Sequence, residues 1–174
     1  MAKKVISFTL DPNEIERAIR ELEKYKQEFQ TKVDNYRKRL AEEIAGNASL
    51  NFGSAVIDDR VRGGTRRPEV TVDVNERGDI SVVVANGEDA IWCEFGAGVY
   101  HNGSVGSSPH PYGSELGLTI GSYGKGRGKS KAWGYYDDGE LVITRGTPAS
   151  MPMYNAAQEV TKRAIAIARE VFGA

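Results

Sequence analysis

A run of about 35 residues starting at Pro12 carries apolar side chains in steps of three and four, and Gly46 is the first residue that would interrupt a helix. The apolar positions are Ile15, Ile19, Leu22, Phe29, Val33, Tyr36 and Leu40, with Lys26 in the place of one of them. We therefore predict a helix over residues 12–46, a rod of roughly 50 Å at 1.5 Å per residue.

Such a rod is longer than the domain that would contain it. A globule of 174 residues has a diameter of about 40 Å. We expect the helix to project and to bind another chain, either a second copy or a different protein. The alternative is a kinked helix that packs entirely within the monomer.

The start of this helix carries several capping signals. Asp11 can accept hydrogen bonds from the first N–H groups, Pro12 suits the first helical position, and Glu14 completes a capping-box pattern. Leu10 and Ile15 are spaced to form a hydrophobic staple. A short, half-buried strand is predicted just before the helix from three alternating apolar residues: Ile6, Phe8 and Leu10.

The rest of the chain alternates short strands with helices. Valine and isoleucine in alternate positions predict a β-hairpin over 69–85, and a second hairpin follows over 132–145, with Asp-Gly at its turn. A short helix is predicted over 88–96. The glycine-rich residues 97–131 have few aliphatic side chains, and we expect a flexible loop there.

The final helix is predicted over 151–172, with Ser150 as its N-cap. Small residues in its apolar stripe allow close packing; the stripe is Tyr154, Ala157, Val160, Ala164, Ile167, Ala168 and Val171. Together these elements predict an α+β fold. A single domain over 1–174 is expected, in which the long N-terminal helix and the C-terminal helix pack on antiparallel hairpins.

Charge and cysteine content exclude several classes of protein. The chain has 23 basic and 24 acidic residues, so its net charge of -1 gives no overall attraction to nucleic acid. Cys93 is the only cysteine, which excludes a disulfide scaffold. No window approaches the roughly 20 apolar residues of a membrane span, so no membrane partner is expected.

Two local clusters of basic residues could still contact phosphate groups, and we treat them as possible DNA-facing residues. They are Arg60, Arg62, Arg66 and Arg67 in the first cluster, and Lys125, Arg127, Lys129 and Lys131 in the second. Solvated loops also carry such runs. A second alternative is that acidic residues of an adjacent copy, Asp137, Asp138 and Glu140, receive one of these clusters.

Catalytic and metal-binding patterns are absent from the sequence. A phosphate-binding loop ending at Lys129-Ser130 would need glycine where Tyr123 stands. Cys93, His101 and His110 have no recognised metal or nucleophile spacing. We expect Cys93 to be a small buried residue, both histidines to be solvated or bound to a partner, and no catalytic residue, metal or cofactor.

Two short segments carry a resemblance to a known family. DAIWCEFGAG, residues 89–98, resembles the aromatic-x-x-Glu-Phe-Gly-small signature of neck or tail-completion proteins of tailed bacteriophages, of the HK-ninety-seven gene-product-ten type. TPASMPMYNAA, residues 147–157, is similar to the second signature of that family, which precedes a C-terminal helix. Met153 and Asn155 depart from the residues more frequent in the family.

The resemblance implies a structural virion protein without enzymatic activity. It would form a homo-oligomeric ring at the head–tail junction, between the connector and the tail proteins, after synthesis in the cytoplasm of the host bacterium. Packaged DNA would pass through the ring. The signature residues that would make its contacts are Trp92, Glu94, Phe95, Gly96, Pro148, Pro152 and Met153.

Alternative functions remain open. The nearest is a tail terminator or head-closure protein. A nucleic-acid-binding module using the basic clusters is of another class, and an enzyme using Cys93 with a histidine comes last.

The residues of the first signature also have simple structural interpretations. Trp92 and Phe95 are expected in the core, since large aromatic side chains are seldom exposed on a short helix. Gly96 is expected to end the helix with a positive φ. Glu94 lies between aromatic residues, so it must find a hydrogen-bond donor if it is buried, either in the backbone or in another subunit.

Overall fold

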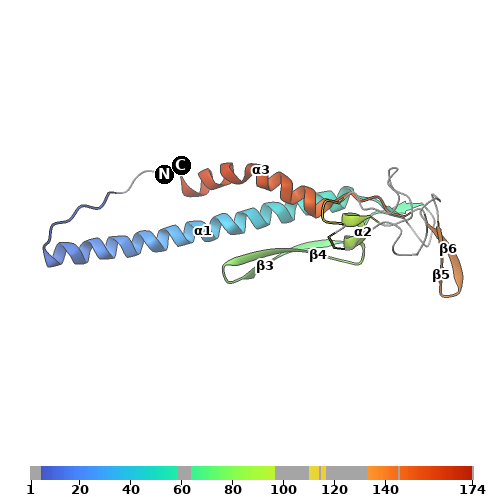
Figure 1. The fold of residues 1–174 in the computed structure, drawn as a ribbon, viewed down its shortest axis with the longest axis horizontal. Helices are drawn as coiled ribbons and strands as arrows, with labels where there is room; N and C mark the ends of the chain where they lie inside the picture. The colour runs from blue at the N-terminus through green and yellow to red at the C-terminus, as the bar shows by residue number, and fades with distance from the viewer. Residues whose placement is uncertain are drawn as a thin grey trace.

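The computed structural model describes residues 5–58, 64–96, 110–113, 115–116, 133–144 and 146–173. Within these residues it contains three helices and three separate two-stranded antiparallel sheets, which confirms the predicted α+β class (Figure 1). In chain order the elements are α1 Pro12–Ser54, β1 Ile57–Asp58, β2 Thr65–Arg66, β3 Thr71–Arg77, β4 Ile80–Asn86, α2 Asp89–Phe95, β5 Trp133–Asp137, β6 Glu140–Thr144 and α3 Pro152–Phe172.

Helix α1 has 43 residues and is longer than predicted, because it continues through Gly46 to Ser54. A glycine inside a helix costs about 1 kcal/mol relative to alanine. The turns beyond it bury Ala48 and Phe52, and burial of a phenylalanine side chain is worth about 2 kcal/mol or more. Tertiary packing therefore outweighs the local signal for a helix end.

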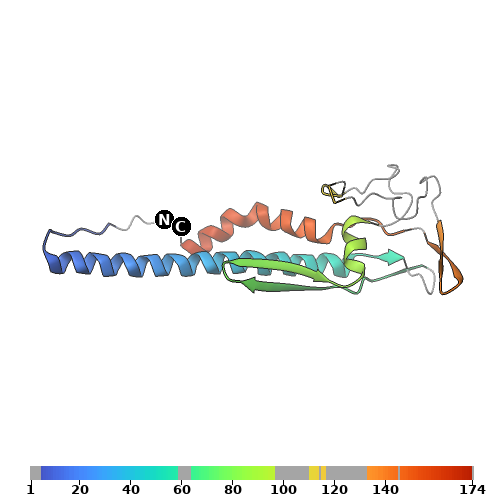
Figure 2. The ribbon, with the colours of Figure 1, turned by 60° about the horizontal axis from the view of Figure 1, so that its bottom comes forward.

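The start of α1 matches the capping prediction only in part. The Asp11 carboxylate accepts hydrogen bonds from the backbone N–H of Asn13 at 2.9 Å and of Glu14 at 3.3 Å. The predicted strand before it is wrong, because residues 5–10 pair with no strand and run back beside α1 (Figure 2). Leu10 is exposed, so the predicted staple with Ile15 is absent as well.

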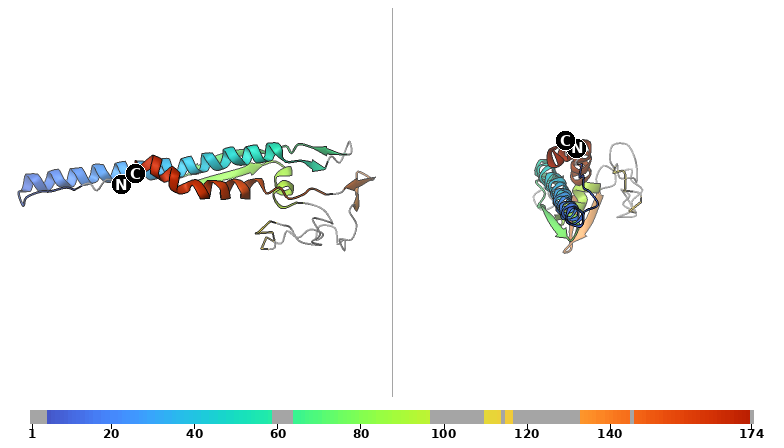
Figure 3. Two further views of the ribbon diagram at one scale, coloured as in Figure 1. Left: turned by 90° about the horizontal axis from the view of Figure 1, so that it is seen from above. Right: turned by 90° about the vertical axis from the view of Figure 1, so that its left-hand side faces the viewer.

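Helix α3 packs antiparallel on α1 (Figure 3). Asn51 donates to the carbonyl of Pro152 at 3.1 Å, and Tyr36 donates to that of Ala164 at 3.2 Å. The Phe172 ring at the end of α3 lies 5.8 Å from the ring of Phe29. Contacts therefore extend over the whole length of α3.

Small residues allow this close packing, as the sequence predicted. Ala48 of α1 and Ala156 of α3 have no exposed surface. Val160 and Ile167 of the predicted stripe are buried, whereas Ala157 is only half-buried.

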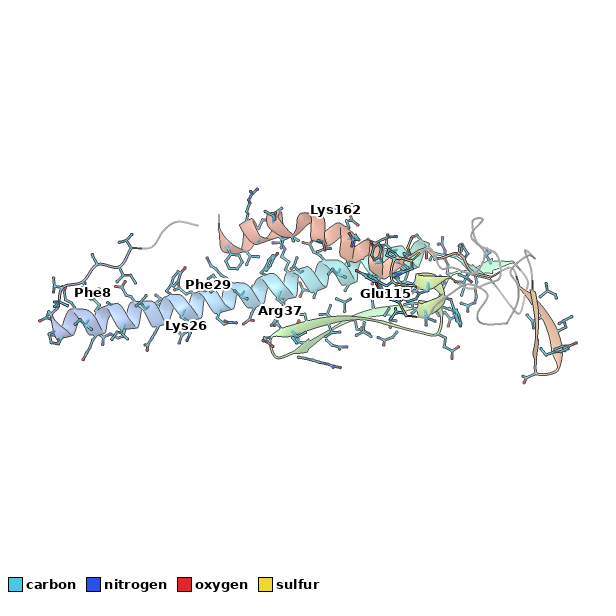
Figure 4. All side chains as sticks on the ribbon, viewed as in Figure 1. Phe8, Lys26, Phe29, Arg37, Glu115 and Lys162 are labelled. Atoms are coloured by element: carbon cyan, nitrogen blue, oxygen red, sulfur yellow. The ribbon has the colours of Figure 1, made fainter. Side chains whose placement is uncertain are left out.

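The hairpin β3–β4 lies along a second side of α1 (Figure 1). Its apolar residues pack with those of the neighbouring elements around the end of α1, where the buried cluster consists of Phe52, Ala55, Ile57 and Cys93. At the far end of the hairpin, Arg37 of α1 donates to the carbonyl of Gly78 at 2.9 Å and pairs with Glu76 at 2.9 Å. Figure 4 labels Arg37 on the side of α1 that faces the hairpin.

The hairpin β5–β6 lies apart from both helices, beyond the end of α1 (Figures 1 and 2). The prediction that the hairpins pack on the helices is therefore wrong for this one. Its turn is at Asp138 and Gly139, and one of its faces presents Tyr136, Leu141 and Ile143 to solvent. The predicted loop over 97–131 lies outside the described residues, except for 110–113 and 115–116.

The first turns of α1 project beyond its partners. Since α3 ends beside Phe29, residues 12–28 form an overhang of about 25 Å at 1.5 Å per residue. Ile19 and Leu22 on this overhang are 50% and 55% exposed. The predicted projection of the rod is confirmed, while its contact with another chain stays a prediction.

We expect Gly46→Ala to stabilise the protein by about 0.5–1 kcal/mol. Gly46 is helical, and a Cβ there would meet nothing within 4 Å. Urea unfolding followed by circular dichroism would measure the change.

Gly87→Ala is the matched control. Its Cβ would clash with the carbonyl oxygen of Glu69, at a φ of +134°, so the substitution should destabilise the protein. A loss of stability in Gly46→Ala would indicate a helix that breaks at Gly46 in solution.

Candidate functional site

The two segments that carry the family resemblance meet at the junction of α2 and α3. The backbone N–H groups of Ser150 and Met151 donate to the carbonyl of Cys93, at 2.8 and 3.2 Å. The chain at 147–149 lies so close to Gly96 that a Cβ there would be 3.0 Å from the nitrogen of Ala149. Residues distant in the sequence thus form one unit, which we call the α2–α3 junction: residues 93–96, 110–112 and 147–154.

The Glu94 carboxylate binds the N-terminus of α3. It accepts hydrogen bonds from the backbone N–H of Met153 at 2.8 Å and of Tyr154 at 2.9 Å, and the residue is only 8% exposed. A carboxylate in this position satisfies two N–H groups that lack helical partners and interacts favourably with the helix dipole. The prediction that a buried Glu94 must find a donor is confirmed, and these donors are backbone groups.

This arrangement replaces the N-cap that the sequence suggested. The N-cap residue is Met151, which has a left-handed φ of 52° and no capping side chain. Ser150 instead donates through its hydroxyl to the carbonyl of Cys93 at 3.2 Å. The predicted cap at Ser150 is therefore wrong, because Glu94 already binds the N–H groups that it would cap.

His110 supplies a third partner for Glu94. Its Nε2 lies 3.0 Å from the Glu94 carboxylate, and its Nδ1 accepts from the backbone N–H of Tyr112 at 3.1 Å. Since Nδ1 acts as an acceptor, the proton is on Nε2 and is donated to Glu94. The expectation of a solvated or partner-bound histidine is wrong for this residue, which is buried.

Aromatic rings enclose this histidine. Its ring centroid lies 4.4 Å from that of Phe95, 5.2 Å from Tyr154 and 5.8 Å from Tyr112. His101, the other predicted candidate, lies outside the described residues. The sequence contained no spacing signal that pairs His110 with Glu94.

The remaining signature residues support the junction in different ways. Gly96 ends α2 with a φ of 78°, as predicted. Trp92 and Phe95 are half-buried, so the prediction that they lie in the core is wrong. Pro152 is buried, whereas Pro148 is exposed. Met153 packs against the core cluster around Phe52.

A second buried carboxylate of α2, Asp89, was missed by the sequence analysis. It accepts two hydrogen bonds from the Arg66 guanidinium, at 2.8 and 3.1 Å, and one from the backbone N–H of Glu69 at 2.9 Å. Nothing in the local pattern links residues this far apart. The bidentate pair ties α2 to the chain that enters β3.

The predicted DNA-facing clusters are described only in part. Arg66 binds Asp89, and Arg67 donates to the carbonyl of Gly53 at 2.8 Å, near the end of α1. Both guanidinium groups therefore have structural partners in their own chain. The other six predicted residues lie outside the described part of the structure: Arg60, Arg62, Lys125, Arg127, Lys129 and Lys131.

Cys93 is 1% exposed, which confirms its predicted burial. Burial, followed by the negative charge of Asp89, raises the pKa of its thiol to about 11. In the described ranges, no group of three or more His, Cys, Asp or Glu side chains is arranged to hold a metal. The helices in those ranges include none that is long and apolar enough to cross a membrane.

We expect Glu94→Ala to destabilise the protein by about 1–3 kcal/mol, because two buried N–H groups and His110 would lose their acceptor. Glu94→Gln should cost less, since its amide oxygen can still accept one of these hydrogen bonds. Urea unfolding would measure both. Glu88→Ala is the control, because Glu88 is exposed and makes no capping hydrogen bond; equal losses in Glu88→Ala and Glu94→Ala would contradict the prediction.

We expect the Cys93 thiol to react with iodoacetamide far more slowly in the native protein than in urea at pH 8, because the thiolate is the reactive form. Since the folded pKa of about 11 is above the unfolded value, the unfolded chain releases its proton first. Stability should therefore fall as the pH rises from about 9 towards 11. Equal labelling rates in the native and unfolded protein would contradict this prediction.

Comparison of this chain with protein-family models, with curated proteins and with solved structures found no match.

Proposed function

We propose that this chain is a structural virion protein of a tailed bacteriophage, a neck or tail-completion component that assembles into a homo-oligomeric ring at the head–tail junction. Its partners would be further copies of itself and the adjacent connector and tail proteins. The assignment to a phage rests on the resemblance of residues 89–98 and 147–157. The α2–α3 junction supports it, because these two segments lie together and contact each other.

The observation that carries the assembly role is the uncovered apolar surface of the hairpin β5–β6, which projects from the helices as the overhang of α1 also does. Leu141 and Ile143 of β5–β6 are 58% and 62% exposed, on the same face as Tyr136. An isolated two-stranded hairpin is at best marginally stable in water. Exposed apolar side chains on such a hairpin favour a protein that completes its packing against neighbours.

The junction gives these contacts a defined geometry. The chain that leaves β6 reaches α3 through residues 147–151, which Cys93 and Gly96 contact. Glu94 then fixes the first turn of α3, which packs along α1. The hairpin is thereby connected through a short, anchored segment to the helical body.

The rival functions fit this surface less well. A tail terminator or head-closure protein would use the same kind of contacts and differs only in its neighbours. A nucleic-acid-binding module would rely on basic residues, of which Arg66 and Arg67 already bind groups in this chain. An enzyme using Cys93 would require access to a side chain that is 1% exposed.

We expect Ile143→Glu to fold normally but to prevent assembly, because it places a charge on the apolar face of the hairpin. Negative-stain electron microscopy would show whether rings form, and complementation of a phage that lacks the gene would show whether heads and tails join. Circular dichroism would verify folding.

Ile165→Glu is the matched control. Ile165 lies on α3, away from the hairpin, and is 69% exposed, close to the 62% of Ile143. The same isoleucine-to-glutamate change is therefore made at a similarly exposed position. Rings and normal head–tail joining with Ile143→Glu would refute the proposal, as would equal failure of both variants. Salt-sensitive binding of duplex DNA by the isolated monomer, without rings, would favour the nucleic-acid-binding function.

A further inference from the structure

The apolar stripe on the overhang of α1 continues a surface that is already used for packing. Val33, Tyr36 and Leu40 lie on the stripe where the chain's own elements cover it, and all three are half-buried. Phe29 marks the boundary, since it touches the last aromatic residue of α3 (Figure 4). Beyond it the stripe continues with the same period but without a helix to cover it.

The N-terminal segment does not cover this uncovered part of the stripe. Residues 5–10 run back beside the first turns of α1, and Ala18 is buried there (Figure 2). Three side chains of the stripe, Ile19, Leu22 and Phe29, and the neighbouring Tyr25 remain 42–55% exposed, whereas Ile15 is half-buried. Phe8 of the segment is itself 53% exposed.

Charge along the overhang reverses from one half to the other. Residues 12–23 contain four glutamates and two arginines, a net charge of -2, whereas residues 24–32 contain three lysines and one glutamate, a net charge of +2. A parallel second copy would place like charges together. An antiparallel second copy would place the acidic half of each helix against the basic half of the other.

We propose that two copies of this chain pair through the overhangs of α1, antiparallel and about a two-fold axis near Leu22. Each overhang then covers the other's stripe and continues the antiparallel packing that α3 begins. About this axis Ile15 of one copy lies opposite Phe29 of the other. Glu16 lies about 3 Å along the helix axis from the level of Lys26 of the other copy, an offset that two long side chains can span. This contact is a property of the free chain and does not depend on the proposed ring.

The first test is the mass of the full-length chain by size-exclusion chromatography with light scattering, over a range of concentrations. The wild-type protein should approach twice 19.0 kDa. Leu22→Glu should raise the dimer dissociation constant by about tenfold or more, because Leu22 contacts its own copy at the centre of the pair. Leu50→Glu is the matched control, because Leu50 is 74% exposed on α1 outside the overhang, and it should leave the dissociation constant unchanged.

The second test separates antiparallel from parallel pairing. Glu16→Lys and Lys26→Glu should each weaken the homodimer, because each variant opposes like charges at both ends of the pair. Mixing the two variants should restore a heterodimer, in which both pairs are again of opposite charge. Lys38→Glu, exposed on α1 outside the overhang, is the matched control and should dimerise like the wild type.

Three results would overturn the inference: a wild-type monomer at about 100 µM, homodimers unaffected by Leu22→Glu, or single-charge variants that do not recover when mixed. The wild-type protein would be a monomer if the chain's own N-terminal segment bound the stripe. The ring proposal fails separately, because Ile143→Glu should still form the α1 dimer while losing rings.

Discussion

The hydrogen bonds between the Glu94 carboxylate and the first turn of α3 determine how the two halves of this chain fit together. They provide acceptors for N–H groups that would otherwise be buried without a partner, because Met151 and Pro152 at the start of the helix supply no capping side chain. The same carboxylate accepts from His110, so a third part of the chain is fixed at the same point. With the start of α3 fixed, its apolar stripe can pack along α1.

Helix α2 is too short to be stable in isolation, yet two of its buried residues are carboxylates. Each of these two carboxylates accepts hydrogen bonds from donors in a different part of the chain. Asp89 binds Arg66 and the backbone before β3, whereas Glu94 binds α3. Charges on one seven-residue helix thus connect the strands that precede it with the helix that ends the fold.

Local patterns predicted the helices and strands well because their periodicity is set by nearby residues. The α2 helix and α3 lie within about one residue of their predicted ranges, and the need of Glu94 for a hydrogen-bond donor was predicted from its position between aromatic residues. The strand predicted from Ile6, Phe8 and Leu10 is wrong although its local alternation is clear, because these residues pair with no other strand of the described chain. The other errors involve distant residues. Gly46 looked like a helix end because the packing of Ala48 and Phe52 is invisible in the sequence. His110 and Asp89 were missed or misjudged since their partners lie far along the chain.

Uncovered apolar surface occurs at both ends of this elongated molecule, with the α2–α3 junction between them. At one end, the overhang of α1 continues the apolar stripe on which α3 packs. At the other end lies β5–β6 (Figure 1), which exposes one apolar face. The two proposed contacts, a symmetric pairing through the overhang of α1 and a contact with the next subunit through β5–β6, would therefore use different surfaces of the chain. A compact monomer would need neither of these two uncovered apolar surfaces. Their presence at opposite ends of the molecule is the strongest structural argument for the proposed assembly subunit.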